Sequence, residues 1–295
     1  MSTDNQSLSS TRTWTILSLL EWSADHLSFR GFEDARLNAE LLLAHVLGLS
    51  RLQLYTQHDR PVVQTELDAY RNLLRRRLNH EPIQYVLGET EFMGHSLLVT
   101  PDVLIPRPET EQLVERTLDA IRLMDLPEPR ILDIGTGSGN IAIAIGLRVS
   151  RAVITSIDAS PAALKIAAQN IERHRLNSIT LLQADVFENP LPGQRFDAIV
   201  SNPPYISLAE FDSLQPEVRD FEPRVATTDG EDGFRFIRLI SELSAEKLNA
   251  GGYLLMEIAY NQSYEAKAIV STVGLIDVQV FNDLSGIPRI VQGRK

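Results

Sequence analysis

Apolar residues recur at helical spacing through about the first 80 residues, and no alternating strand pattern interrupts them. A first helix is predicted around Ile16–Leu27, and a denser apolar helix over Leu37–Leu47, which Gly48 can end. Within Val63–Leu78 an apolar residue returns at every third or fourth position, which is typical of an amphipathic helix. The pattern therefore predicts a small all-α domain over residues 1–84.

The last of these helices also carries four arginines, namely Arg71, Arg75, Arg76 and Arg77. Such a cluster forms either a solvated basic face or a contact for an acidic or RNA-containing partner. The pattern alone leaves both interpretations open.

The helical pattern of apolar residues ends before residues 85–105. Tyr85–Leu87 and Leu97–Val99 are short apolar runs with two glycines between them, which is typical of two extended strands joined by a turn. We therefore expect a β-hairpin linker over residues 85–105. A helix is predicted to begin near Pro108, because proline favours the first helical position and acidic residues follow it.

From Arg130 onward, strand-like apolar runs alternate with helical patterns. The strands are expected at residues 131–134, 152–157, 179–183, 196–200, 252–257, 276–281 and 289–292. Repeated βα units predict a mostly parallel, doubly wound sheet within an α/β domain over residues 106–295. The last two strands have no helix between them, so they are expected to pair antiparallel.

Composition narrows the function classes. The chain of 295 residues has 28 basic and 39 acidic residues, a formal net charge of −11, which opposes DNA or RNA binding except through a local patch. It has no cysteine, so disulfides and thiolate metal sites are excluded, and its histidines show no metal-ligand spacing; we expect no metal. Because neither a signal peptide nor a run long enough to span a bilayer is seen, a soluble cytoplasmic protein is expected.

A glycine-rich loop follows the first strand of the α/β domain. Its residues are Gly135, Thr136, Gly137, Ser138 and Gly139. Glycines allow a tight turn and close approach to a ligand, and the following helix offers N–H groups at its N-terminus. The G-x-G-x-G spacing is one residue shorter than the dinucleotide fingerprint. The loop alone therefore favours an adenosine-containing ligand, and a dehydrogenase would look similar.

Acidic residues end the next two strands. Asp158 is placed to accept hydrogen bonds from both ribose hydroxyls of an adenosine ligand. Asp185 is placed to accept a hydrogen bond from the exocyclic amine of adenine, and Val186 is placed to flank the adenine ring. A structural cap at Asp158 and a plain turn at Asp185 are the alternatives.

The tetrapeptide Asn202, Pro203, Pro204 and Tyr205 ends the fourth strand. Ligands of doubly wound sheets bind beyond the carboxyl ends of the strands, so the tetrapeptide is predicted to lie beside the glycine-rich loop. The Asn202 side-chain oxygen and the Pro203 carbonyl can accept the two hydrogens of an amide or amine and direct its lone pair. The prolines fix that carbonyl in advance, and Tyr205 is expected to pack on the planar substrate.

These two motifs together predict an S-adenosylmethionine-dependent methyltransferase that acts on a planar amide or amine nitrogen. In-line methyl transfer requires proximity and alignment more than a strong base, so no general base is assigned.

Over nearly its whole length the chain resembles the HemK-like (PrmC) protein-(glutamine-N5) methyltransferases, which modify class-1 peptide chain release factors. Besides the loop and the tetrapeptide, the matching segments are Pro82–Gly88, Leu104–Glu111, Glu217–Arg224, Gly230–Gly233 and Asp283–Gly286. The resemblance implies a helical domain that helps to hold the release factor, a hairpin linker and a seven-stranded class I (Rossmann-like) methyltransferase domain. The implied substrate is the glutamine of a Gly-Gly-Gln motif, and the implied by-product is S-adenosylhomocysteine.

The resemblance also implies roles by position. Gly135–Gly139, Asp158, the Asp185/Val186 pair and Asn202 would contact S-adenosylmethionine, and Asn202–Tyr205 would contact the glutamine. Arg107 and the loop 217–224 would support the substrate pocket, or only stabilise that loop by ion pairing. Some family members carry an aromatic residue where this chain has Val186, so adenine stacking from that position is left open. A monomer with no stable nucleic acid and no membrane association is expected.

Three alternatives remain at this level. A related enzyme that methylates a glutamine of a large-subunit ribosomal protein shares the tetrapeptide, but Pro106–Glu111 fits the release-factor branch better. An adenine-N6 methyltransferase on DNA or RNA presents the same acceptor geometry, but the acidic balance opposes it. A non-enzymatic S-adenosylmethionine-binding protein would have no need of a group that orients a nucleophile.

Overall fold

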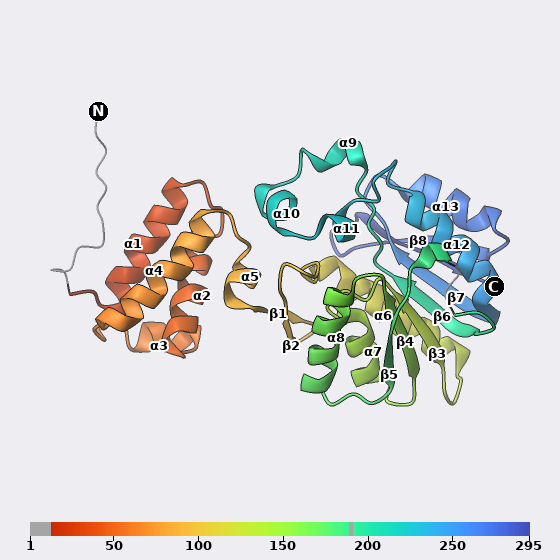
Figure 1. The fold of residues 1–295 in the computed structure, drawn as a ribbon, viewed down its shortest axis with the longest axis horizontal. Helices are drawn as coiled ribbons and strands as arrows, with labels where there is room; N and C mark the ends of the chain where they lie inside the picture. The colour runs from red at the N-terminus through yellow and green to blue at the C-terminus, as the bar shows by residue number, and fades with distance from the viewer. Residues whose placement is uncertain (1–12, 189–190) are drawn as a thin grey trace. The chain divides into compact units, whose positions relative to one another are not determined.

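The structure is a computed structural model that describes residues 13–188 and 191–295. Contacts divide the chain into two compact units, Met1–Leu87 and Gly88–Lys295 (Figure 1). The division after Leu87 puts the expected linker hairpin within the second unit. The functional boundaries at residues 84 and 105 stay predictions.

The first unit is all-helical, as predicted. Its helices are α1 (Ile16–Phe29), α2 (Ala35–Leu47), α3 (Arg51–Thr56), α4 (Gln64–Leu78) and α5 (Ile83–Leu87). Thr15 and Ser18 form a capping box at the start of α1, and Gly48 closes α2 with a φ of 63°. The apolar faces of the longer helices meet in one core, in which Leu19 and Tyr70 are fully buried.

The expectation of an extended run at Tyr85–Leu87 is wrong, because these residues lie in α5. The Val86 N–H donates to the Pro82 carbonyl at 3.0 Å, and the turn ends at Gly88 with a φ of 79°. Val86 joins the helical core. Periodicity cannot separate strand from helix in so short an apolar run, and burial against the helical unit decided the outcome.

The arginines of α4 do not form one solvated face. Arg77 is buried: its Nε donates to Asn38 Oδ1 at 2.7 Å, and its guanidinium lies 4.2 Å above the centre of the Phe32 ring. Arg76 pairs with Glu81 at 2.5 Å. Arg77 is therefore a core residue of the helical unit, which the sequence pattern did not reveal.

The second unit is a seven-stranded sheet with helices on both faces, as predicted. The strands are β3 (Arg130–Ile134), β4 (Val153–Asp158), β5 (Ile179–Gln183), β6 (Phe196–Ser201), β7 (Leu248–Glu257), β8 (Ile276–Asn282) and β9 (Pro288–Arg294). The longer helices are α6 (Pro108–Met124), α7 (Asn140–Arg148), α8 (Pro161–Arg173), α12 (Arg235–Lys247) and α13 (Ser263–Thr272). The order β5-β4-β3-β6-β7-β9-β8 is parallel up to β7, and β9 pairs antiparallel with both β7 and β8, which confirms the expected last pair.

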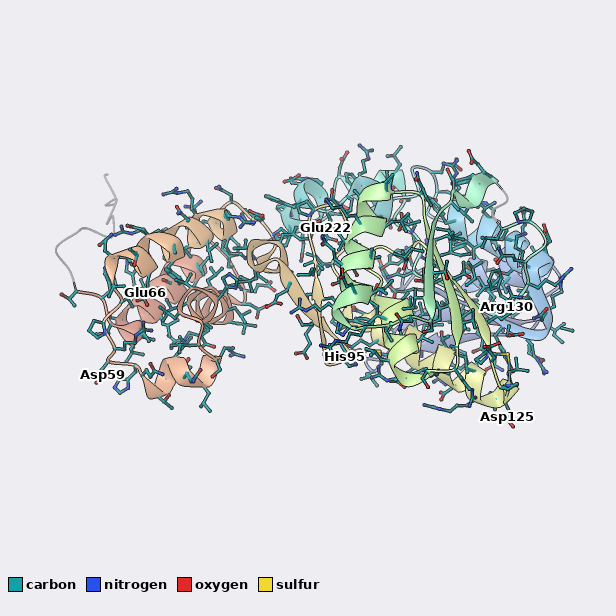
Figure 2. The ribbon with its side chains drawn as sticks, turned by 60° about the horizontal axis from the view of Figure 1, so that its bottom comes forward. Asp59, Glu66, His95, Asp125, Arg130 and Glu222 are labelled. Carbon is teal, nitrogen blue, oxygen red and sulfur yellow. The ribbon has the colours of Figure 1, made fainter. Side chains whose placement is uncertain are left out.

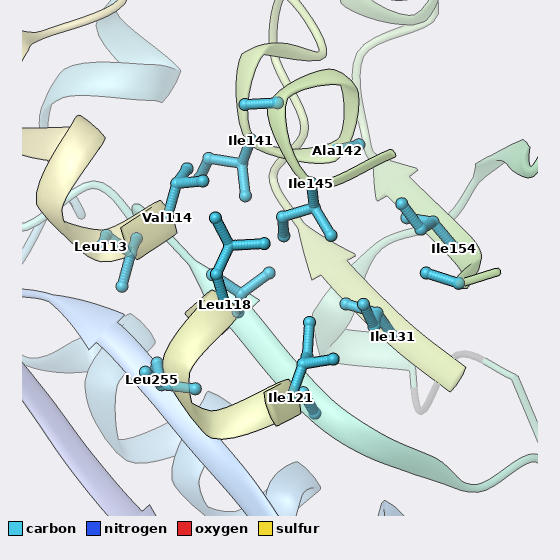
Figure 3. Close-up of a cluster of buried hydrophobic side chains, with 14 of the residues drawn as sticks. Leu113, Val114, Leu118, Ile121, Ile131, Ile141, Ala142, Ile145, Ile154 and Leu255 are labelled. Carbon is cyan, nitrogen blue, oxygen red and sulfur yellow. The ribbon is translucent and has the colours of Figure 1, made fainter. Parts of the chain in front are cut away.

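Successive residues of each strand point to opposite faces of this sheet. On one face Ile131, Ile154 and Leu255 pack under α6 and α7, as Figure 3 shows. On the other face Leu132 and Met256 pack against α12 and α13. Strands buried on both faces read as nearly continuous apolar runs, which is why their positions could be predicted.

The expected hairpin is formed by β1 (Glu89–Phe92) and β2 (His95–Leu98). It packs on α8, where Asn170 Oδ1 accepts from the Leu98 N–H at 2.7 Å and Asn170 Nδ2 donates to the Leu98 carbonyl at 3.0 Å. The same Nδ2 donates to the Ser138 carbonyl at 2.9 Å. Fully buried Asn170 therefore ties the hairpin to the glycine-rich loop.

The sequence pattern did not reveal several short elements besides α3. They are the 3-10 turn η1 (Val186–Glu188) and the helices α9 (Leu208–Phe211), α10 (Pro216–Phe221) and α11 (Arg224–Thr227). Elements of about one turn show no apolar period, so periodicity cannot detect them. Across residues 13–188 and 191–295, none of the helices has the length and apolar character that a bilayer crossing requires.

We expect Asn170→Ala to lower the free energy of unfolding by about 3 kcal/mol, because it removes the partner of the buried Ser138 carbonyl and of two part-buried backbone groups of Leu98. Urea denaturation followed by circular dichroism measures this change. The control is Gln169→Ala, at an exposed position of the same helix. Equal midpoints for the two variants would contradict the anchoring role of Asn170.

Candidate active site

A cavity of about 240 Å³ opens at the carboxyl ends of the parallel strands. The chain runs from β3 to β4 and β5 on one side and returns to β6 on the other, so the strand order reverses between β3 and β6. Open α/β sheets bind ligands at such a point, because the loops diverge there. The cavity is lined by the loops after these strands, by the start of α6 and by the segment between β6 and α12.

The glycine-rich loop forms one wall of the cavity. Four of its five residues line it, namely Gly135, Thr136, Gly137 and Ser138. Gly135 and Gly137 have φ values of 74° and 54°, which residues with a Cβ rarely adopt. Gly139 is not part of the lining; it precedes α7 with a φ of 83°, a backbone conformation that residues with a Cβ rarely adopt.

Asp158 lines the cavity from the end of β4. Its Oδ2 accepts from the Gly137 N–H at 2.9 Å, and its Oδ1 accepts from the Ser160 N–H at 2.9 Å. Burial raises the pKa of Asp158, and these two hydrogen bonds oppose the rise. Each carboxylate oxygen can accept a further bond, so Asp158 can hold the loop and also receive a hydroxyl.

Asp185 and Val186 line the cavity after β5. Asp185 Oδ1 accepts from the Phe187 N–H at 2.9 Å, which is a turn-forming bond. Val186 is buried, whereas Phe187 is 42% exposed, lines the cavity and stands edge-on to Phe236 with 5.3 Å between ring centroids. The aromatic side chain that faces this part of the cavity is therefore Phe187, one residue after Val186, and sequence reasoning did not select it.

Asp133, near the end of β3, precedes the glycine-rich loop, and sequence reasoning gave it no role of its own. Its Oδ2 accepts from the Thr136 hydroxyl at 2.6 Å and from the Ser156 hydroxyl at 3.3 Å. Burial raises the pKa of Asp133 to about 7. Its Oδ1 and the Ser138 hydroxyl are buried without a hydrogen-bond partner among the residues that the structure describes. Ser138 lines the cavity, whereas Asp133 does not. An unpartnered hydroxyl in the lining fits a ligand that carries polar groups.

The tetrapeptide forms the wall on the β6 side, where Asn202, Pro203 and Pro204 line the cavity. Tyr205 is not part of the lining; it is partly buried, and its hydroxyl donates to Glu257 Oε1 at 3.2 Å. The structure thus gives Tyr205 a contact with an acidic side chain, and its packing on a substrate stays a prediction. The tetrapeptide and the glycine-rich loop share one cavity, as their positions after β6 and β3 require.

The backbone of the tetrapeptide is held from outside the cavity. Gln262 Nε2 donates to the Tyr205 carbonyl at 2.9 Å and to the Gly233 carbonyl at 3.0 Å. A Cβ at residue 233 would lie 2.7 Å from the Tyr205 oxygen, and Gly233 has a φ of 87°. Only glycine fits there, which explains why the Gly230–Gly233 segment ends in glycine.

Glu257, the last residue of β7, is a further site residue that the sequence reasoning missed. It is 1% exposed, and its Oε2 accepts from the Thr110 hydroxyl at 2.6 Å. The Thr110 oxygen in turn accepts from Asn202 Nδ2 at 3.0 Å. Burial raises the pKa of Glu257 to about 7. An acid that ends the apolar run Tyr253–Met256 is the sequence signal that could have found it.

Arg107 lines the cavity just before α6 and pairs with Glu222, which follows α10 and is labelled in Figure 2. Arg107 Nη2 donates to Glu222 Oε1 at 2.6 Å, and the Glu222 side chain is 1% exposed. Burial raises the pKa of Glu222, and Arg107 opposes this rise. The pair therefore links the segment between β6 and α12 to Arg107. Arg107 also lines the cavity, so its support of a substrate pocket stays a prediction.

The comparisons with known proteins cover both units. Residues 18–88 match the family model described as the PrmC N-terminal domain, and residues 112–214 match the one described as the methyltransferase small domain. A release factor glutamine methyltransferase of Geobacter sulfurreducens is 44% identical over 281 residues, 95% of this chain and 97% of that protein. One of Rhodopirellula baltica is 42% identical over 286 residues, 96% of this chain and 97% of that protein.

Among solved structures, a methyltransferase of Pyrococcus furiosus has a TM-score of 0.50 at 17% identity and covers 76% of this chain and 98% of its own, which supports the fold alone. A doubly wound seven-stranded sheet whose cavity lies between a glycine-rich loop and Asn-Pro-Pro-Tyr is the architecture of class I S-adenosylmethionine-dependent methyltransferases. This chain is one of them. It belongs to the release factor glutamine methyltransferase family.

We expect Arg107→Leu to speed amide hydrogen exchange in residues 216–227 by about tenfold or more, because a buried carboxylate without its partner costs at least about 1.4 kcal/mol. Exchange followed by mass spectrometry resolves this segment. Arg219→Ala is the matched control, because Arg219 pairs with Asp220 at the surface of the same segment. If both variants exchange at the same rate, the ion pair does not fasten the segment.

Proposed function

We propose that this protein transfers a methyl group from S-adenosylmethionine to the side-chain amide nitrogen (N5) of the glutamine in the Gly-Gly-Gln motif of class-1 peptide chain release factors. The observation that carries the proposal is that Asn202, Pro203 and Pro204 line the same cavity as the glycine-rich loop and Asp158. Relatives that span 95% or more of this chain bear the same activity in their names.

The residues present fit the methyl donor. Gly135 and Gly137 leave room, since a Cβ at residue 135 would meet nothing within 4 Å, so a ligand can approach the backbone there. We assign Asp158 to the ribose hydroxyls and Phe187 with Val186 to the adenine ring. The donor supplies a methyl group on a positively charged sulfur, which is electrophilic without further activation.

An amide nitrogen is a weak nucleophile, because its lone pair is delocalised into the carbonyl group. We assign the Asn202 Oδ1 and the Pro203 carbonyl to the two hydrogens of the glutamine amide. These acceptors would hold the nitrogen with its lone pair toward the methyl group. The nitrogen gains the methyl group and loses one of its protons to solvent, while the carbon–sulfur bond breaks and leaves S-adenosylhomocysteine.

The same reasoning extends to the setting of the reaction. We propose a monomeric cytoplasmic protein, since release factors act there, with no stable nucleic acid partner. The net charge of −11 supports a protein substrate over DNA or RNA. The helical unit Met1–Leu87 is proposed to help to hold the release factor.

Asn202→Ala is expected to lower methyl transfer by at least about 100-fold, because it removes an acceptor that orients the nucleophile. Cofactor affinity measured by calorimetry should change far less, because the glycine-rich loop and Asp158 remain. Asn177→Ala, at an exposed position outside the cavity lining, is the matched control. Normal transfer by Asn202→Ala would refute the role given to the tetrapeptide.

The acceptor is tested with a radiolabelled methyl donor and three separate substrates: a class-1 release factor, large-subunit ribosomal proteins and RNA. We expect label in the release factor, and its loss when the glutamine of Gly-Gly-Gln is replaced by alanine. Label in ribosomal protein alone would favour the related glutamine methyltransferase. Label in RNA alone would exclude a glutamine acceptor.

A further inference from the structure

Three side chains from three separate elements form a continuous hydrogen-bonded chain behind the cavity. Asn202, after β6, donates from Nδ2 to Thr110 Oγ1 at 3.0 Å. Thr110, in the first turn of α6, donates from its hydroxyl to Glu257 Oε2 at 2.6 Å at the end of β7. Thr110 and Glu257 are each 1% exposed, so water does not compete for the bond between them. Asn202 and Thr110 both line the cavity.

The direction of these bonds follows from the chemistry of Glu257. Above its pKa of about 7, Glu257 is an ionised carboxylate that only accepts hydrogen bonds, so the single hydroxyl proton of Thr110 must point toward it. A distance of 2.6 Å is typical of such a charge-assisted O–H···O⁻ bond. The Thr110 oxygen can then only accept from Asn202, which must present its NH₂ group there. The Asn202 carbonyl oxygen is thereby turned away from Thr110.

We propose that Thr110 and Glu257 are positioning residues that set the polarity of the Asn202 amide, so that its carbonyl oxygen faces the acceptor nitrogen of the substrate. The inference rests on the proposed function, since that function requires an acceptor rather than a donor at this point. The two ends of an asparagine side chain have nearly the same shape, so packing alone cannot select between them. A buried charge two bonds away makes that selection.

Other groups around Glu257 affect its hydrogen bonding and its pKa. Tyr205 donates its hydroxyl to the second oxygen, Oε1, at 3.2 Å, so both carboxylate oxygens are occupied by donors. Burial raises the pKa of Glu257 to about 7 against the bonds from Thr110 and Tyr205, which lower it. The charge of Glu109 in α6 also raises this pKa, and that of Arg289 in β9 lowers it. Below that pH the protonated Glu257 can donate to Thr110, which can then donate to the Asn202 oxygen and reverse the amide.

The first test removes the hydroxyl without changing the shape of the side chain. Thr110→Val should lower kcat on release factor by about 10- to 100-fold, because the Asn202 amide loses the partner that fixes both its orientation and its position. The dissociation constant of S-adenosylmethionine should change less than about threefold. Thr110→Ser keeps the hydroxyl and should restore kcat to within about threefold of the unsubstituted protein.

Thr117→Val is the matched control. Thr117 lies in the same helix, is fully buried and donates its hydroxyl to the Leu113 carbonyl of its own helix at 2.8 Å. Its substitution removes a buried hydroxyl from α6 without touching Asn202, so kcat should stay unchanged. A Thr110→Val protein with normal kcat would overturn the proposal. So would Thr110→Ser falling as far as Thr110→Val.

The second test is the pH profile of kcat, which a merely structural role would not move. In the unsubstituted protein kcat should fall as the pH drops through about 7, because Glu257 becomes protonated there. Glu257→Gln cannot titrate, so its kcat should be lower above pH 7 and should lack this acid limb. An unchanged acid limb in Glu257→Gln would show that another group causes it and would overturn the role of Glu257.

These outcomes separate the inference from the proposed function. If the unsubstituted protein labels no release factor, the proposed function fails. If it labels release factor and Asn202→Ala abolishes the transfer while Thr110→Val leaves kcat normal, the proposed function stands and the polarity inference alone fails.

Discussion

β3 and β6 pair in parallel although β4 and β5 lie between them in the chain. Their register sets Ile134 opposite Ser201, and the Ser201 hydroxyl donates to the Ile134 carbonyl at 2.8 Å. The two loops that line the cavity leave the sheet from these neighbouring ends. Because a slip of one residue would turn every side chain to the other face, the apolar core that fixes this register also fixes the site.

Among the buried acids of this unit, Asp133, Glu222 and Glu257 each hold a neighbouring side chain of the site. Burial raises the pKa of each of these three acids, which means that their charged forms lose hydration in the folded protein. Their burial therefore costs free energy of folding. Each instead fixes a part of the cavity: the glycine-rich loop through Thr136, the segment after β6 through Arg107, and Asn202 through Thr110. Surface ion pairs elsewhere in the chain have no comparable effect.

The cavity is thus built from small residues and prolines that determine backbone shape, and from buried polar side chains that hold this backbone in place. Asn170 ties the glycine-rich loop to the hairpin, and Gln262 ties the tetrapeptide to Gly233. Both are fully or almost fully buried amides that satisfy backbone groups with no partner in regular secondary structure. A methyl transfer that depends on aligned reactants rather than on a strong base requires such a rigid binding site.

The sequence by itself determined the elements that carry a long apolar period or a buried apolar run, and the motifs at the ends of β3 and β6. Those signals are local, since they depend on spacing along the chain. Only the tertiary structure decided that Tyr85–Leu87 is helical, that Arg77 is a core residue, that Tyr205 contacts Glu257 and that Gly233 allows the close approach of the Tyr205 carbonyl. Each of these depends on a partner distant in the sequence, and a side chain's burial and partner are fixed only when the elements pack.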